Sequence, residues 1–364
     1  MVGTAIRHEV ERTSPPSGTR RRWEAAAVLA LLLLAVVVRL PTLGQPLVEH
    51  HEFRQTQTAY TALLFHEDGV DLLHPKLPVL GEPFEAPFEF PLFQAVAAAA
   101  MSWGLSPDVA MRTSALACFV LSAVLLWGLV RHVAGRRAAL VALALFLFSP
   151  FALLWSRASL IEYLAVAGAL GWLWAGLLWR DRRRPAYAVA AVVAGLVCML
   201  VKPTTGALWV LPLLAYTAAT ERPGWRDWLR ARLDPVLGLI VTVPFLAALA
   251  WTRHADAVKA ASDATAWLTS AHLTTWNFGT LDQRLVLGNW SRIVGRMTTQ
   301  LTLYPAWLLP LGARSASGRA PPASGPRWLR SPCSPSSPSG TSTSSTTTTW
   351  PPSRRSRPRW PASQ

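Results

Sequence analysis

The stretch Val48–Ala59, "VEHHEFRQTQTA", gathers two Glu, two His, one Arg and two Gln within twelve residues. A positioned carboxylate can take the proton of a poor nucleophile, and a guanidinium can neutralise an anionic group such as a phosphate. This polar stretch begins eight residues after the apolar run Trp23–Leu40. The question is therefore whether it forms a solvated loop or a reactive site beside a membrane.

The composition places these residues in a membrane protein. Of 364 residues, 51% are hydrophobic and 15% are charged, whereas soluble proteins carry about 25% charged residues. Several runs approach the roughly 20 apolar residues that cross a bilayer as a helix. These observations predict an all-α polytopic membrane protein. The apolar segments are Trp23–Leu40, Thr113–Val130, Ala138–Leu154, Leu160–Trp179, Ala186–Val201, Gly206–Thr220, Pro235–Trp251 and Leu301–Gly312.

The net charge of +15 does not indicate nucleic-acid binding, because the basic residues lie in short clusters between apolar segments. Such clusters face the cytoplasm in membrane proteins. The clusters lie at 131–137, 180–184 and 222–232, and each pair of neighbouring clusters encloses two apolar segments, as two crossings of the membrane require. We expect a multi-pass protein of the plasma or inner membrane with a cytoplasmic N-terminus.

One apolar segment, Phe90–Leu105, has only sixteen residues and carries Pro91 near its start. If it crossed the membrane, the cluster Arg131–Arg137 would lie outside. We therefore predict a short interfacial helix that does not cross. The stretch 41–112 then becomes one long outer loop bearing interfacial helices.

The C-terminal fifty-two residues, 313–364, differ from the rest of the chain. They include fourteen Ser, ten Pro and eight Arg with no Asp or Glu, and they cannot bury a core. The predicted domains are a polar cytoplasmic segment 1–22, a transmembrane domain 23–312 and a disordered tail 313–364. Because the change falls inside an apolar segment, we also expect that the tail is read out of frame or follows a truncation.

Three ionisable residues are predicted at outer helix ends near the polar stretch. Glu162 begins an apolar segment, Lys202 ends another just before a proline, and Arg157 lies on the intervening turn. Charged side chains at such depth are expensive and are candidates for function. The simpler interpretation is that each side chain reaches the lipid headgroups, which suits a carboxylate less well than a cation.

The sequence does not predict a metal or cofactor site. Glu49, His50, His51 and Glu52 are chemically suitable metal ligands, but adjacent residues seldom chelate one ion and no known ligand spacing occurs. The three cysteines, Cys118, Cys198 and Cys333, also lack metal-like spacing and imply no disulfide framework. Glycine-rich nucleotide-binding motifs are missing too, which argues against a nucleotide-sugar donor.

Several stretches, taken in order, resemble the GT-C membrane glycosyltransferases. They are "EHHEFRQTQTA", "GVDLLHP", "FEFPLFQ", "RTS", "SPFALLWSRASLIE" and "LVKPT". The closest branch is the family 39-like group, with dolichyl-phosphate-mannose and aminoarabinose transferases and RgtA/B/C/D-like bacterial enzymes. The resemblance covers roughly residues 41–205 and continues more weakly to 312.

The resemblance implies transfer of a sugar from a polyprenyl-phosphate carrier to a lipid, glycan or protein acceptor on the outer face. It implies that a first-loop carboxylate acts on the acceptor hydroxyl. The family uses Asp there, whereas this chain has Glu49, with Glu52 as a rival. The family's second acid matches Glu162. The lysine by which the family binds the lipid phosphate has no match, and Glu89 stands in that region.

The chemistry of such a transfer assigns the remaining polar residues. A departing lipid phosphate needs cations or hydrogen-bond donors. The candidates are Arg54, Arg157, Lys202 and His51, while Gln55 and Glu89 are candidates for positioning the acceptor or the loop. We retain two alternatives, a transporter or flippase of lipid-linked envelope precursors and an inactive fragment. A transporter would carry its charges near helix centres and show internal repeats.

Overall fold

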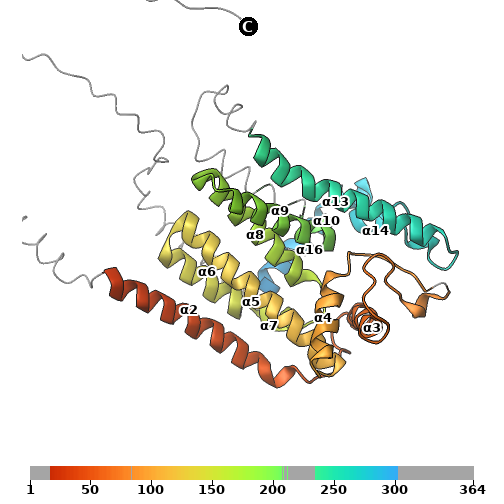
Figure 1. Cartoon of the computed structure of the whole chain (residues 1–364), viewed down its shortest axis with the longest axis horizontal. Coiled ribbons are helices and arrows are strands. Elements are labelled where there is room, and N and C mark those ends of the chain that lie inside the picture. Colours follow the sequence, from red (N-terminus) through yellow and green to blue (C-terminus); the bar gives the residue numbers. More distant parts are fainter. Residues whose placement is uncertain (1–16, 83, 207, 209–210, 212–233, 302–364) are drawn as a thin grey trace, which may run out of the picture. The chain divides into compact units, whose positions relative to one another are not determined.

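The computed structural model describes residues 17–82, 84–206, 208, 211 and 234–301 (Figure 1). Every regular element within these ranges is a helix, and the all-α polytopic membrane architecture is confirmed. The helices are α2 (Ser17–Arg39), α3 (Glu52–Asp68), α4 (Leu92–Ser102), α5 (Pro107–Ala134), α6 (Arg136–Phe148), α7 (Pro150–Trp155), α8 (Glu162–Arg182), α9 (Pro185–Val201), α10 (Pro203–Gly206), α13 (Pro235–Ala260), α14 (Thr274–Phe278), α15 (Leu281–Leu285) and α16 (Leu287–Arg296).

Within the described ranges, four helices are long and apolar enough to cross a membrane, namely α2, α5, α8 and α13. Contacts between neighbours run in the order α2, α6, α5, α8, α9 and α13, and Figure 1 shows these helices side by side. Helix α8 is central, with 72% of its apolar span buried, whereas only 17% of the α2 span is buried. Most of the α2 surface is thus free to contact lipid.

Two glycines allow the central helices to approach closely. A Cβ atom on Gly168 of α8 would lie 2.7 Å from the backbone nitrogen of Cys198 on α9. A Cβ atom on Gly195 of α9 would lie 2.6 Å from Cγ of Pro244 on α13. Small residues at helix crossings are the usual way in which membrane helices gain tight packing.

One end of the bundle is tied together by ion pairs. The buried carboxylate of Glu24 on α2 lies 2.7 Å from Nε of Arg131 and 3.0 Å from Nε of Arg136. His132 Nε2 lies 2.9 Å from the carboxylate of Asp181 on α8. The predicted grouping of these helix ends is therefore found in the structure. We call this the basic end.

The opposite end is braced by Arg39, whose side chain is buried at the end of α2. Its Nη1 donates to the carbonyl oxygen of Ala35 at 2.8 Å. Its Nη2 donates to the carbonyl oxygens of Leu147 at 2.8 Å and Ala152 at 3.2 Å. These bonds join α2 to the junction of α6 and α7 and satisfy carbonyls that the junction frees.

That junction corrects a sequence prediction. The apolar segment Ala138–Leu154 was expected to form one helix, but it is divided into α6 and α7. Ser149 is extended, and its Oγ accepts a hydrogen bond from the backbone nitrogen of Ala152 at 3.2 Å. The proline ring disfavours the helical conformation for the residue before it, here Ser149. Pro150 itself then begins the new helix.

Other boundaries also shift. Helix α5 begins at Pro107 rather than Thr113, and α13 continues nine residues beyond the predicted end at Trp251. The segment Phe90–Leu105 forms the eleven-residue helix α4, which is too short to cross a bilayer. The predicted helix at 206–220 and the segment 301–312 lie almost wholly outside the described residues, as does the tail.

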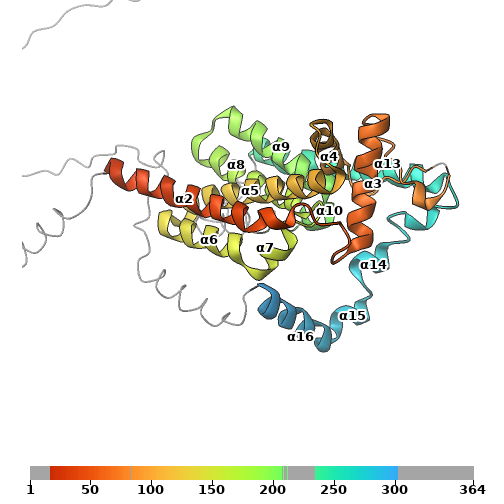
Figure 2. The same cartoon turned by 90° about the horizontal axis from the view of Figure 1, so that it is seen from below.

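The first loop is ordered around α3 and α4, which contact one another and α5. The C-terminal part of α13 supports the chain between α3 and α4. Trp251 Nε1 donates to the carbonyl oxygen of Phe88 at 3.2 Å, and His254 Nε2 lies 2.9 Å from the carbonyl oxygen of Leu73. Figure 2 shows α3 and the C-terminal part of α13 at the same end of the helices. We call this the loop end.

Candidate active site

The candidate residues come from three segments that meet at the loop end. These are the chain leading into α3, the turn 156–161 between α7 and α8, and the end of α9. Gln55 joins the first two segments from a buried position. Its Nε2 donates to the carbonyl oxygen of His50 at 2.8 Å, and its Oε1 accepts from the backbone nitrogen of Ser159 at 2.9 Å.

Glu49 lies between two arginines. One carboxylate oxygen is 3.2 Å from Nη2 of Arg157, and the other is 4.0 Å from Nη2 of Arg112. Nη1 of Arg157 also donates to Oε1 of Gln45 at 2.9 Å. The guanidinium of Arg157 is thus held by two side chains from the first loop, while its Nε has no hydrogen-bond partner among the described residues.

Arg112 was not recognised as a site residue from the sequence. It is fully buried in α5. It donates to the carbonyl oxygens of Gln45 at 2.8 Å, Pro46 at 2.7 Å and Arg157 at 3.2 Å. Arg112 therefore fixes the backbones that carry both partners of the Glu49–Arg157 pair. The available signal in the sequence was Pro107, which begins the helix that contains Arg112. An arginine buried in such a helix needs several hydrogen-bond acceptors, and the loop backbone supplies them.

The two histidines form an aromatic group with Trp155 of α7. Their rings lie 6.4 Å (His50) and 5.3 Å (His51) from the Trp155 ring. His51 precedes α3 with a left-handed backbone, φ 59° and ψ 39°. Glu52 is exposed as the first residue of α3, where a carboxylate favours the positive end of the helix dipole. The histidines border Glu49, whereas Glu52 extends into solvent.

Glu162 and Lys202 form a second cation–carboxylate pair. Lys202 Nζ donates to Oε1 of Glu162 at 2.8 Å, and both side chains are partly exposed. Oε2 of Glu162 has no hydrogen-bond partner among the described residues. Lys202 follows the last residue of α9 because Pro203 cannot continue that helix. The start of α8 and the end of α9 therefore each contribute one member of this ion pair.

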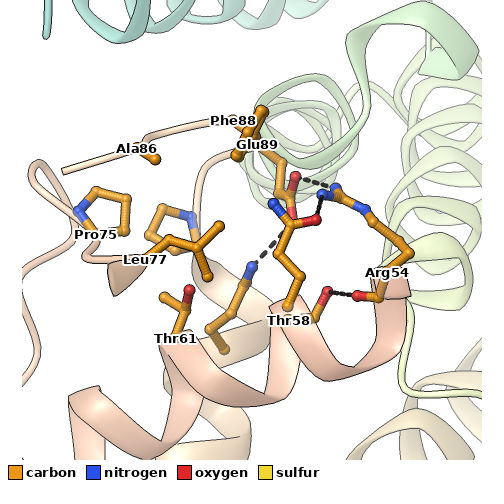
Figure 3. A pocket seen from close by; sticks show the side chains of 11 residues that line it. Arg54, Thr58, Thr61, Pro75, Leu77, Ala86, Phe88 and Glu89 are labelled. Atoms are coloured by element: carbon orange, nitrogen blue, oxygen red, sulfur yellow. Dashed lines mark hydrogen bonds and ion pairs between the residues drawn. The ribbon is translucent and has the colours of Figure 1, made fainter. Parts of the chain in front are cut away.

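Arg54 and Glu89 form a third pair, within the first loop, and Figure 3 shows their side chains pointing toward one another. Nη1 of Arg54 donates to Oε1 of Gln57 at 3.0 Å, and Nε2 of Gln94 donates to Oε1 of Glu89 at 3.0 Å. The neighbouring carboxylate of Glu89 raises the pKa of the Arg54 guanidinium above its usual value. The Arg54–Glu89 pair thus joins α3 to the start of α4.

A small cavity lies beside this pair. Its walls include Arg54, Thr58, Phe88 and Glu89, as Figure 3 shows. Its volume of about 20 Å³ accommodates one water molecule and is too small for a sugar. Phe88 is also covered by two cations, with Cζ of Arg54 5.8 Å and Nζ of Lys259 5.6 Å from the ring centre. Arg54 is therefore enclosed by packing as well as paired.

The three ion pairs differ in how many partners already engage each cation. Arg54 is engaged by Glu89, Gln57 and Phe88, whereas Arg157 and Lys202 each bind one partly exposed carboxylate. The charge of Glu162 also acts on Arg54, so the second and third pairs lie within electrostatic range. The predicted residues other than Glu52 thus all make contacts at the loop end, in three separate ion pairs and through Gln55 and His51. Among the described residues, no group of three or more His, Cys, Asp or Glu side chains is arranged to hold a metal ion.

Residues 86–251 match the family model of dolichyl-phosphate-mannose-protein mannosyltransferases. The matched region includes Glu89, Arg157, Glu162 and Lys202, and it excludes the stretch 49–55 that precedes it. No curated protein and no solved structure gives a significant match to the chain.

Proposed function

Because the chain belongs to the GT-C family of membrane glycosyltransferases, we propose that it transfers a sugar from a polyprenyl-phosphate carrier to an acceptor hydroxyl at the loop end. The observation that carries this proposal is the pair of partly exposed cation–carboxylate contacts, Arg157–Glu49 and Lys202–Glu162. Both contain the two chemical groups that such a transfer needs, and both lie at the loop end of the bundle.

In the proposed reaction, Glu49 accepts the proton of the acceptor hydroxyl. The hydroxyl oxygen forms a bond to the anomeric carbon of the sugar while the bond from that carbon to the phosphate oxygen breaks. The electron pair leaves with the polyprenyl phosphate, whose growing negative charge is stabilised by cations. Arg157 and Lys202, whose side chains are partly exposed at the loop end, supply that charge.

Each of these cations holds a carboxylate before the donor arrives. Binding of a lipid phosphate to Arg157 would loosen Glu49, and binding to Lys202 would loosen Glu162. A carboxylate freed from its cation is a better base, so donor binding prepares the acceptor side. Glu162 has the second role of orienting the acceptor, because its side chain is partly exposed beside Lys202.

Arg54 receives a different assignment from the phosphate-binding role that the sequence suggested, whereas Glu89 keeps the role of positioning the loop. Their mutual contact, the bond from Gln94 and the packing of Phe88 support a structural role in holding the first loop. Gln55 likewise acts as a positioning residue, since both ends of its amide bind backbone. His51 remains a candidate donor to the phosphate beside Arg157, and exposed Glu52 remains the rival base.

The proposed topology puts the N-terminus in the cytoplasm and the site on the outer face. The basic residues gathered at the end of the bundle opposite the site support this orientation. The acceptor is a lipid, glycan or protein hydroxyl on that face, and the sugar is a hexose or pentose.

The experiment supplies membranes containing the full chain with radiolabelled polyprenyl-phosphate sugars or nucleotide sugars. We expect label to move from the lipid-linked donor to a new product, and no direct use of the nucleotide sugar. The double variant Glu49→Gln/Glu162→Gln should abolish transfer. Recovery of all label as unchanged lipid-linked sugar on the opposite side of the vesicle would instead support a transporter and contradict the proposal.

A further inference from the structure

Helix α16, Leu287–Arg296, has one strongly apolar face whose side chains are exposed within the part of the chain that the structure describes. Its exposed fractions are 83% for Leu287, 53% for Trp290 and 56% for Val294. These positions are spaced by three and four residues and therefore share one side of the helix. Met297, in the next turn, continues the same side and is also exposed.

The opposite side of α16 is polar and basic. Arg292 and Arg296 are four residues apart, and both lie roughly half a turn away from the apolar side. Between Thr274 and Leu301 the sequence contains Arg284, Arg292 and Arg296 against a single acid, Asp282. A helix with an apolar side and net positive charge is suited to the surface of an anionic bilayer.

The short helices before α16 are fixed to it by hydrogen bonds. Arg284 Nε donates to the carbonyl oxygen of Phe278 at 2.8 Å, which joins α15 to α14. Asn289 Nδ2 donates to the carbonyl oxygen of Gln283 at 2.8 Å, which joins α16 to α15. A capping box of Thr280 and Gln283 begins α15. The three helices, which follow one another in Figure 2, are thus a connected unit.

The indole N–H group of Trp290 already has a hydrogen-bond partner within the protein. Its indole Nε1 donates to the carbonyl oxygen of Arg284 at 2.6 Å. Burial of an indole in lipid is costly when its N–H group loses its partner, and here the partner belongs to the protein. The ring can therefore enter the headgroup region without leaving a donor unsatisfied.

We propose that α14–α16 lies on the bilayer surface next to the loop end, with the apolar side of α16 inserted among anionic lipids. Ten residues are too few to cross the bilayer, which leaves an orientation parallel to the surface. Chain connectivity supports the location, because this unit follows α13, whose C-terminal part contacts the first loop. The inference depends on membrane insertion of the chain and not on the proposed sugar transfer.

The test uses nitroxide labels on the full chain in vesicles of phosphatidylglycerol and phosphatidylcholine. Cys333 is changed to Ser, since Cys118 and Cys198 are buried. Single cysteines are then introduced as Val294→Cys on the apolar side and Arg292→Cys on the polar side. A label at Leu33→Cys, on the exposed surface of α2, provides the lipid reference.

We expect the Val294→Cys label to resemble the Leu33→Cys label, with high collision rates for oxygen and low rates for a water-soluble nickel chelate. The Arg292→Cys label should show the reverse. The difference should shrink in pure phosphatidylcholine, because the arginines then lose their anionic partners. Equal effects in both lipids would overturn the assignment to anionic lipid.

Two further outcomes would overturn the proposal altogether. Nickel accessibility of both labels would show that α16 lies in water. A Val294→Cys label that is immobilised and inaccessible to both reagents would show that protein covers this side. Spin–spin broadening would then identify a second copy as the cover, and its absence would identify another segment of the same chain.

Discussion

The two ends of the helix bundle use the same residue types for different purposes. At the basic end, the Glu24 carboxylate is 6% exposed and binds two arginines, and Asp234 caps α13 while pairing with Arg183. At the loop end, the carboxylates of Glu49 and Glu162 are 29% and 45% exposed, and each has one close cation. The carboxylates of Glu24 and Asp234 are thus enclosed where they join helices, whereas those of Glu49 and Glu162 remain open to solvent.

Among the cations of the two ends, the largest expected effect on transfer concerns Arg157 at the loop end. In Arg157→Met, we expect the transfer rate to fall about 100- to 1,000-fold, because one donor to the leaving phosphate is lost. The melting temperature in detergent should change little, since the backbone bond from Arg112 to residue 157 remains. Arg157→Lys, which keeps the charge without the planar fork, should be intermediate. A wild-type rate in Arg157→Met would remove Arg157 from the site.

Arg54 tests whether a loop-end pair can be structural. Arg54→Met leaves the buried Glu89 carboxylate without its cation, and we expect the free energy of unfolding to fall by about 2 kcal/mol. The double variant Arg54→Met/Glu89→Leu should recover most of the loss. Thermal unfolding in detergent measures both. If Arg54→Met were as stable as the wild type and had a raised KM for the donor, Arg54 would instead be a phosphate-binding residue.

Glu24 tests the basic end directly. We expect Glu24→Gln to lower the free energy of unfolding by about 1–2 kcal/mol, because Arg131 and Arg136 are partly exposed and part of the ion-pair energy is screened. Transfer kinetics below the melting temperature should match the wild type. A large change in kcat for Glu24→Gln would show that the two ends are not functionally separate.

Lys202 should give the smallest effect. Lys202→Met removes a partly exposed cation, so unfolding should be unaffected while the KM for the donor rises about tenfold. Initial rates at several donor concentrations separate KM from kcat. A destabilised protein with unchanged KM would place Lys202 among the structural pairs.

The sequence predicted the coarse arrangement well because the signals for it are local. Apolar runs separated by arginine clusters indicate which helix ends lie together, and those ends are joined by Glu24, Arg131 and Arg136 in the structure. The same reasoning brought Glu162 and Lys202 to one end. Sequence spacing contains no information on distances across the fold, so the partner of each cation could not be predicted.

Two omissions have specific physical causes. Arg112 was assigned to a loop because the apolar pattern begins at Thr113, yet the helix starts at Pro107 and encloses the guanidinium. The break at Ser149 was hidden because the apolar run continues through it, although Pro150 provided the signal. Both cases involve backbone conformation rather than hydrophobicity.

The role of the loop-end carboxylate is tested most directly by the transfer rate of Glu49→Gln compared with that of Glu67→Gln. Both substitutions neutralise a carboxylate of the first loop, and Glu67 is exposed near the end of α3. With a lipid-linked radiolabelled donor, we predict a loss of about 10²- to 10⁴-fold for Glu49→Gln and a wild-type rate for Glu67→Gln. Equal rates in the two variants would contradict the proposed role of the loop-end carboxylate.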